Sequence, residues 1–97
     1  MKKIKTDFLI VGSGLYGCVL AERIANKLKK KVTIIEKRDH IGGNCYSEID
    51  KSTGIEFHKY GSHIFHTSNK NVWNYLKKFT SLNNYKHQVL SKYKSQS

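Results

Sequence analysis

A glycine-rich motif, Gly12-x-Gly14-x-x-Gly17, directly follows an apolar run that ends at Val11. In dinucleotide-binding loops, each glycine of such a motif has its own structural role. The first makes a tight turn out of a strand, the second lets the backbone approach a pyrophosphate, and the third lets helix and strand pack closely. The free N–H groups and the dipole of the next helical turn then face the anion. The motif predicts cofactor binding by Gly12, Ser13, Gly14, Leu15, Tyr16 and Gly17.

An acidic residue, Glu36, lies 19 positions after Gly17. This is close to the spacing of about 20 residues at which a carboxylate accepts hydrogen bonds from the ribose of the adenosine half. A carboxylate there repels a 2′-phosphate, which argues against NADP although Arg38 is close by. The spacing therefore predicts an ADP-containing dinucleotide, with Glu36 as a cofactor-binding residue.

A second glycine turn, Gly42-Gly43, follows Glu36 and distinguishes FAD from NAD. The segment 36–44 resembles the E-x-R-x-x-x-G-G pattern of flavoproteins of the glutathione-reductase and amine-oxidase type. A turn without side chains lets backbone N–H groups approach the longer flavin side of FAD, and Arg38 adds a fixed positive charge near the same anion. Taken alone, two adjacent glycines indicate an ordinary turn. Their spacing from Glu36 favours FAD, with contacts from Lys37, Arg38, Gly43 and Asn44.

The elements that must position these residues form a β-α-β unit. The continuous apolar block before Gly12 is typical of a parallel strand buried on both faces. Apolar residues recur at helical spacing between Gly14 and Lys29, and the segment 31–36 is rich in β-branched residues, as strands are. A right-handed crossover would place the two strands side by side in parallel. The predicted fold class is therefore α/β, a partial Rossmann-like β-α-β dinucleotide-binding unit.

The rest of the chain predicts a loop-rich segment, a helix and a strand. We expect a loop over 37–44, a short extended piece over 45–48, a turn over 50–54 and a strand over 55–58. Ser68 or Asn69 can cap a helix that runs to about Phe79. Alternation of side chains over 85–93 predicts a half-exposed strand.

Length, charge and cysteine content limit the function classes. A complete doubly wound fold has about six parallel strands, whereas only two segments of this 97-residue chain have that character. The net charge of +11 comes from lysines scattered along the chain without a nucleic-acid motif. We therefore predict no nucleic-acid partner but a basic surface that attracts an anionic ligand. Cys18 and Cys45 are too few for a disulfide framework, which predicts a cytoplasmic setting, and no stretch is long enough to span a membrane.

The segment 58–67 is rich in histidine, glycine and aromatic residues. As a metal site it offers three histidines, with Cys45 from elsewhere, but the spacing matches no common zinc pattern, so we predict no metal. As plain structure, the histidines would satisfy hydrogen bonds in an aromatic-rich loop. As a functional loop, Gly61 provides a backbone able to change conformation, while His63 and His66 could donate hydrogen bonds to phosphate or flavin.

Three segments together, 38–46, 58–67 and 72–75, closely resemble the N-terminal part of bacterial UDP-galactopyranose mutase, and the likeness runs from about Asp7 to Tyr93. The resemblance implies FAD as cofactor and UDP-galactose as substrate, converted between its pyranose and furanose forms for cell-surface polysaccharides. It implies that FAD must be reduced, because the flavin itself is the nucleophile.

The resemblance also implies roles for the segment 58–67. The loop that begins at Tyr60 would lie against the flavin, with Gly61 and His63 as the residues that matter for catalysis. Contacts to the cofactor would come from Tyr60, Gly61, Ser62, His63 and Ile64.

Members of that family are several times longer, and full-length members would be expected to form homo-oligomers. We therefore expect residues 1–97 to be the N-terminal part of an FAD-binding domain, truncated at its C-terminus and inactive alone. Two alternatives remain open. The chain could be a fragment of an amine-oxidase-like or glutathione-reductase-like flavin oxidoreductase, or a non-catalytic remnant.

Overall fold

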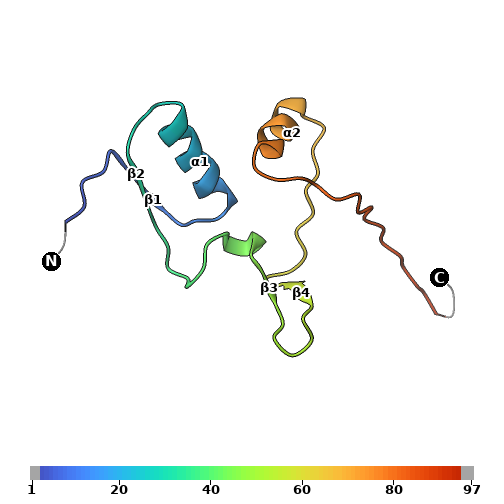
Figure 1. Cartoon of the computed structure of the whole chain (residues 1–97). Coiled ribbons are helices and arrows are strands. Elements are labelled where there is room, and N and C mark those ends of the chain that lie inside the picture. The colour runs from blue at the N-terminus through green and yellow to red at the C-terminus, as the bar shows by residue number, and fades with distance from the viewer. Residues whose placement is uncertain (1–2, 95–97) are drawn as a thin grey trace. The chain divides into compact units, whose positions relative to one another are not determined.

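The computed structural model describes residues 3–94, which fall into two compact units, one that ends at His63 and one that begins at Ile64 (Figure 1). The first unit contains β1 (Phe8–Val11), α1 (Leu15–Asn26), β2 (Val32–Ile35), the 3₁₀ turn η1 (Gly43–Cys45), β3 (Ser47–Ile49) and β4 (Glu56–His58). The second contains α2 (Lys70–Lys77).

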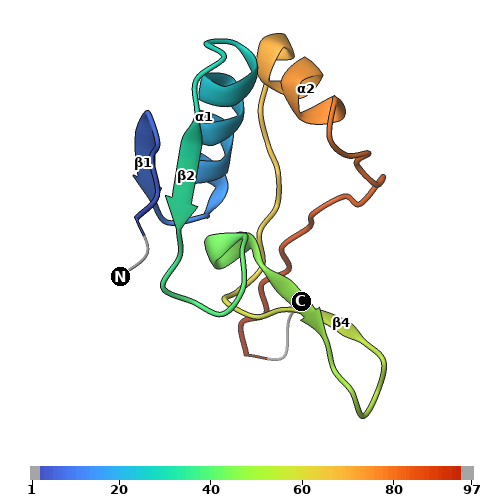
Figure 2. The same ribbon diagram turned by 60° about the vertical axis from the view of Figure 1, so that its left-hand side comes forward.

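The predicted β-α-β unit is present. β1 and β2 pair in parallel, with Phe8 opposite Val32 and Val11 opposite Ile35. The helix α1 connects them and lies along one face of the pair (Figure 2). Ile10 of β1 and Ile24 of α1 are the buried apolar residues of this contact. The α/β fold class and its Rossmann-like character are therefore confirmed.

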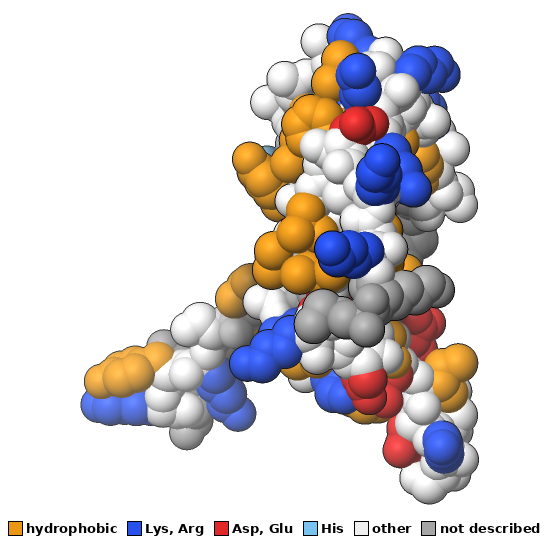
Figure 3. Space-filling model, turned by 90° about the vertical axis from the view of Figure 1, so that its left-hand side faces the viewer, with side chains coloured by type: hydrophobic (Ala, Val, Ile, Leu, Met, Phe, Trp, Pro, Cys, Tyr) orange, Lys and Arg blue, Asp and Glu red, His pale blue; other side chains and the backbone are white. Residues whose placement is uncertain are grey.

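The sequence predicts that β1 is buried on both faces, and this prediction is wrong. Ile10 is the buried residue of this strand, whereas Val11 is 78% exposed. Within the described residues β1 pairs with β2 alone, and α1 covers one face, so an edge and a face stay open. Apolar side chains accordingly reach the surface among the lysines (Figure 3).

The helix α1 is shorter than predicted, ending at Asn26 instead of Lys29. Lys29 adopts a left-handed backbone conformation, φ 57°, and the N–H of Lys30 donates to the carbonyl of Ile24. This turns the chain out of the helix three residues early. Leu28, which belongs to the predicted apolar stripe, lies beyond the helix and is exposed.

The segment after β2 forms the predicted loop, then η1 and an antiparallel hairpin. β3 and β4 pair with Ser47 opposite His58 and Ile49 opposite Glu56. The turn between them contains Asp50, whose carboxylate accepts hydrogen bonds from the hydroxyl groups of Ser52 and Thr53, each at 2.7 Å. These bonds lower the pKa of the Asp50 carboxyl, with Thr53 contributing most.

In the second unit, Asn69 caps α2, as predicted, and its side-chain oxygen accepts from the N–H of Asn71 at 2.9 Å. The Nε1–H of Trp73 donates to the carbonyl of Thr67 at 2.8 Å, and its ring meets Phe65 edge-on at 5.1 Å. The helix ends at Lys77, two residues before the expected end.

The prediction of a strand over residues 85–93 is wrong. Residues 85–92 are irregular, with a single bridge residue at Tyr93. Alternating side chains produce a strand only where a second strand pairs with it. Among the described residues no strand extends along this segment, and Val89 and Leu90 are exposed.

Candidate dinucleotide site

The first glycine turn lies where β1 and β2 end. The N–H of Gly12 donates to the carbonyl of Ile35 at 2.8 Å, which extends the parallel pairing by one residue. Gly12 then adopts φ 100°, a conformation that side-chain-bearing residues rarely adopt. The predicted tight turn out of the strand is therefore present at this position.

Glu36 lies at the end of β2, beside this turn. Its Oε1 accepts from both the backbone N–H and the hydroxyl of Ser13, at 2.8 and 2.6 Å, and its Oε2 accepts from the N–H of Arg38 at 2.9 Å. The Ser13 hydroxyl, followed by the N–H groups of Arg38 and Ser13, lowers the pKa of Glu36 from 4.5 to about 2. The carboxylate is thus ionised and held in one orientation before any ligand binds.

Ser13 itself is only 3% exposed. Sequence reasoning predicted it as a loop residue that contacts the cofactor and missed its bond to Glu36. A hydroxyl within the glycine motif, next to the strand that carries the acid, was the available signal.

The three glycines differ in what the protein requires of them. A Cβ at Gly17 would lie 2.3 Å from the carbonyl oxygen of Gly12, so helix and turn are in direct contact there, as predicted. A Cβ at Gly14 would meet only the Cα of Gly43, at 3.8 Å, an ordinary contact. Gly14 also has an extended backbone, φ −74° and ψ −173°, which any residue can adopt. The packing of the described residues therefore does not require glycine at position 14, where Gly14 serves as the N-cap of α1.

The second glycine turn packs directly on the first. The N–H of Gly42 donates to the carbonyl of Ser13 at 2.9 Å. A Cβ at Gly43 would lie 2.7 Å from the Cα of Gly14, and Gly43 adopts φ 59°. Two turns separated by nearly thirty residues of sequence thus form one backbone surface.

The N-terminus of α1 lies beside this surface. The first intrahelical bond runs from the N–H of Cys18 to the carbonyl of Gly14 at 3.0 Å. No side chain caps this helix, and its first turn carries no acidic residue. Leu15 and Tyr16 are exposed. An uncapped helix start of this kind can accept an anion.

Several predicted residues gather around Tyr60. The Nη1–H of Arg38 donates to Oδ1 of Asn44 at 3.0 Å, and its guanidinium lies 4.1 Å from the centre of the Tyr60 ring. Lys37 is exposed, as is Ser62. The structure thus brings Arg38, Asn44 and Tyr60 together.

The predicted catalytic pair is held by its own backbone. Gly61 adopts φ 101°, and Nδ1–H of His63 donates to the carbonyl of Gly61 at 3.0 Å. Ile64, predicted to contact the cofactor, belongs to the second unit and is exposed. Within residues 3–94, no three His, Cys, Asp or Glu side chains are grouped so that they could hold a metal ion.

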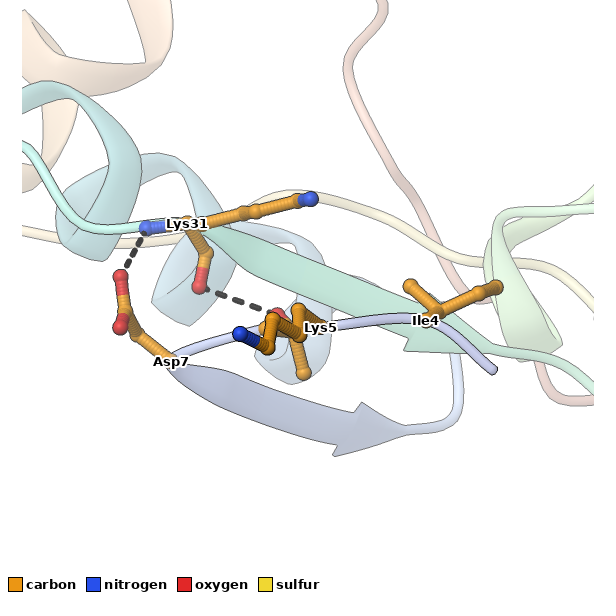
Figure 4. Close-up of a pocket in the computed structure, with 5 residues that line it drawn as sticks. Ile4, Lys5, Asp7 and Lys31 are labelled. Atoms are coloured by element: carbon orange, nitrogen blue, oxygen red, sulfur yellow. Dashed lines mark hydrogen bonds between the residues drawn. The ribbon is translucent and has the colours of Figure 1, made fainter.

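A shallow hollow lies at the opposite end of the two strands, where they begin (Figure 4). The N–H of Lys31 donates to the carboxylate of Asp7 at 2.9 Å, and the hydroxyl of Thr6 donates to the carbonyl of Lys31. These contacts tie the strand starts together. The hollow is therefore remote from the glycine turns and from Glu36.

The model of the NAD(P)-binding Rossmann-like domain family matches residues 10–79. UDP-galactopyranose mutase of Mycoplasma genitalium is 55% identical over 92% of this chain and 22% of the relative. The enzyme of that name from Mycoplasma pneumoniae is 47% identical over 88% of this chain and 21% of the relative. dTDP-fucopyranose mutase of Escherichia coli is 47% identical over 91% of this chain and 23% of the relative. The predicted resemblance is thus confirmed, and the chain spans about a fifth of the length of these relatives.

Neither of the described helices, which are 12 and 8 residues long, has the length and apolar character needed to cross a bilayer.

Proposed function

The chain belongs to the family of NAD(P)-binding Rossmann-like domains, and from that premise we propose that it is the FAD-binding N-terminal segment of a UDP-galactopyranose mutase. The observation that carries the proposal is the pair of glycine turns with the ionised Glu36 beside them. Gly14 has room for a side chain and a backbone that would allow one. A pyrophosphate close to this position explains the glycine where the protein's own packing does not.

We assign each part of the cofactor to residues of the first unit. The first turn of α1 and the Gly12–Gly17 loop would hold the pyrophosphate, because their N–H groups and the helix dipole favour an anion. Glu36 would accept the ribose hydroxyls. Its carboxylate is already oriented by hydrogen bonds from Ser13 and Arg38, and the N–H of Lys37 contributes least to stabilising its charge.

Toward the flavin, we propose contacts from Arg38, Gly43 and Asn44 and from the segment Tyr60–Ile64. Gly61 and His63 would line the reacting face and hold the backbone there. Bound FAD, in its reduced form, would supply the nucleophile toward the sugar. What the residues of this chain contribute is the binding and orientation of that cofactor.

We propose a nucleotide sugar as substrate, since the relatives carry the names of UDP-galactopyranose and dTDP-fucopyranose mutases. UDP-galactose comes first, because two of these three relatives, including the one at 55% identity, bear that name. We further propose a cytoplasmic enzyme that is oligomeric when complete and serves polysaccharide synthesis. Residues 1–97 would then form only part of the FAD-binding domain and would not turn over substrate alone.

The cofactor assignment is tested by titrating the purified chain with FAD and, separately, with NAD, following flavin fluorescence and calorimetric heat. We expect FAD to bind more tightly. Gly14→Ala should keep the far-ultraviolet circular dichroism of the parent, because the Cβ has space, yet bind FAD at least about tenfold more weakly, because it occupies the room of the pyrophosphate. Glu36→Leu should also weaken binding at least about tenfold, as loss of a hydrogen bond to a charged group does.

Equal affinity of Gly14→Ala and parent for FAD would contradict the site, and tighter binding of NAD would contradict the cofactor. The mutase assignment needs a second experiment. The 89-residue segment of this chain that is 55% identical to the Mycoplasma genitalium relative would replace the matching segment of that relative. The chimera should bind FAD and convert UDP-galactopyranose after reduction of the flavin. A folded, flavin-loaded chimera without turnover would refute the assignment.

A further inference from the structure

Four side chains form a cluster between the second glycine turn and the end of β4: Arg38, His40, Tyr46 and Tyr60. We call it the Tyr60 clamp. The rings of His40 and Tyr46 stack with their centroids 3.7 Å apart and their planes 11° from parallel. Nε2 of His40 lies 2.7 Å from the hydroxyl oxygen of Tyr60. The guanidinium of Arg38 covers the Tyr60 ring at 4.1 Å. Tyr60 is therefore held both at its ring face and at its hydroxyl.

The contacts of His40 define which of its nitrogens carries the proton. Nδ1 lies 3.0 Å from the carbonyl oxygen of Ile41, which can only accept a hydrogen bond. Nδ1 must therefore be the protonated nitrogen. In the neutral ring, Nε2 is then an acceptor, and the hydroxyl of Tyr60 donates to it. The stacked ring of Tyr46 holds the imidazole in the plane that makes both bonds possible.

The backbone after Tyr60 has few supports of its own. The N–H of Gly61 reaches the carbonyl of His58 only at 3.5 Å, and Gly61 adopts φ 101°. Before Tyr60, the N–H of Lys59 donates to the carbonyl of Tyr46 at 3.4 Å, and its ammonium pairs with Glu48 at 3.2 Å. The clamp therefore provides strong, short contacts where the backbone bonds are long.

We propose that His40, supported by Tyr46, is a positioning residue that fixes Tyr60 and so restrains the Gly61–His63 backbone that follows it. The second glycine turn is attached to the first by the bond from Gly42 to Ser13. The clamp thereby connects the pyrophosphate side of the site to the segment assigned to the flavin. That the held segment faces a flavin rests on the proposed function; the positioning itself does not.

The test uses the whole 97-residue chain without any ligand, so that its outcome is independent of which cofactor binds. Side-chain ¹⁵N NMR of the histidines should show His40 protonated at Nδ1 at a pH where the ring is neutral. The amide cross-peaks of Gly61 and His63 then report the backbone. His40→Leu and Tyr60→Phe should each displace these peaks, and the double variant should displace them no further than the larger single change, because both remove one bond.

His40→Gln is the conservative variant, since its amide oxygen can accept from the Tyr60 hydroxyl, and it should displace the peaks less than His40→Leu. His87→Leu, the same replacement in the second unit, should leave both peaks in place. The amide cross-peak of Gly12, whose N–H donates to Ile35, checks that the first unit of each variant is folded. Protonation of His40 at Nε2, unmoved Gly61 and His63 peaks in Tyr60→Phe, or additive displacements in the double variant would each overturn the proposal.

Discussion

Replacing Ser13 by alanine tests the link between the glycine turn and the acidic residue. The Ser13 hydroxyl donates to Oε1 of Glu36 at 2.6 Å, a length typical of a bond to an ionised carboxylate. The substitution removes this bond alone, because the backbone N–H of Ser13 also reaches Oε1 and remains. Ser13 is 3% exposed, so the small void left by the hydroxyl should not otherwise disturb the turn.

The size of the effect follows from the contributions to the pKa of Glu36. The pKa falls from 4.5 to about 2, and four hydrogen bonds contribute to the decrease while desolvation opposes it. The Ser13 hydroxyl contributes most of the four. It is the largest single contribution, so Ser13→Ala should raise the pKa of Glu36 from about 2 toward 4.5. The value should stay below 4.5, because the N–H groups of Ser13, Arg38 and Lys37 still stabilise the charge.

The assay is a pH titration of the glutamate carboxyl carbons by ¹³C NMR, with Glu36 assigned from its missing signal in Glu36→Gln. Ser91→Ala, a serine replacement in the second unit, is the matched control. A pKa lowered by folding contributes stability above the unfolded value, near 4.5, and that contribution is lost as the pH falls toward about 2. Since Ser13→Ala brings the pKa of Glu36 in the folded protein closer to its unfolded value, the stability of this variant should depend less steeply on pH within that range. A Glu36 pKa identical in Ser13→Ala and parent would refute the reasoning.

Two further substitutions separate packing from function. Gly17→Ala should destabilise the chain by about 3 kcal/mol or more, above the usual cost of overpacking, because its Cβ would lie 2.3 Å from the rigid carbonyl of Gly12. Chemical denaturation measures this free energy of unfolding, with Gly14→Ala as the control. Equal stability of the two variants would contradict the contact. In the chimera, Gly61→Val should leave most FAD bound but strongly reduce turnover, because φ 101° is strained for a side chain beside the proposed flavin. His63→Ala should likewise reduce turnover more than binding. Parental turnover in both of these variants would show that the segment is structural.

Much of the first unit was predictable because its signals are local. A continuous apolar run, a glycine turn and a helical repeat occur within the segment 8–26, and each fixes its own backbone. Asn69 was predictable as a cap for the same reason, since its bonds reach only two and three residues along the chain. The fold class and the resemblance both followed from such short patterns.

The predictions that were wrong, and the contacts that were missed, depend on partners distant in sequence. Burial of β1 and strand formation over 85–93 each need a second strand or layer, which a local pattern cannot supply. The bonds from Ser13 to Glu36 and from Tyr60 to His40 join residues 23 and 20 positions apart, whose approach is set by the path of the backbone between them. Sequence reasoning therefore found the residue types at the site but not which side chains hold one another.

The two glycine turns show how one residue type serves two different demands. Gly17 and Gly43 are required by the chain itself, since a Cβ at either would overlap backbone, at 2.3 and 2.7 Å. Gly14 lies beside Gly43 and yet has room for a methyl group. Gly14 is the N-cap of α1, a position where serine, asparagine or aspartate would cap the helix slightly better than glycine. The packing of the protein and the capping of α1 therefore do not by themselves require glycine at position 14. We propose that the pyrophosphate of the cofactor accounts for this glycine, because an uncapped helix start and the neighbouring glycine turn leave room for an anion there.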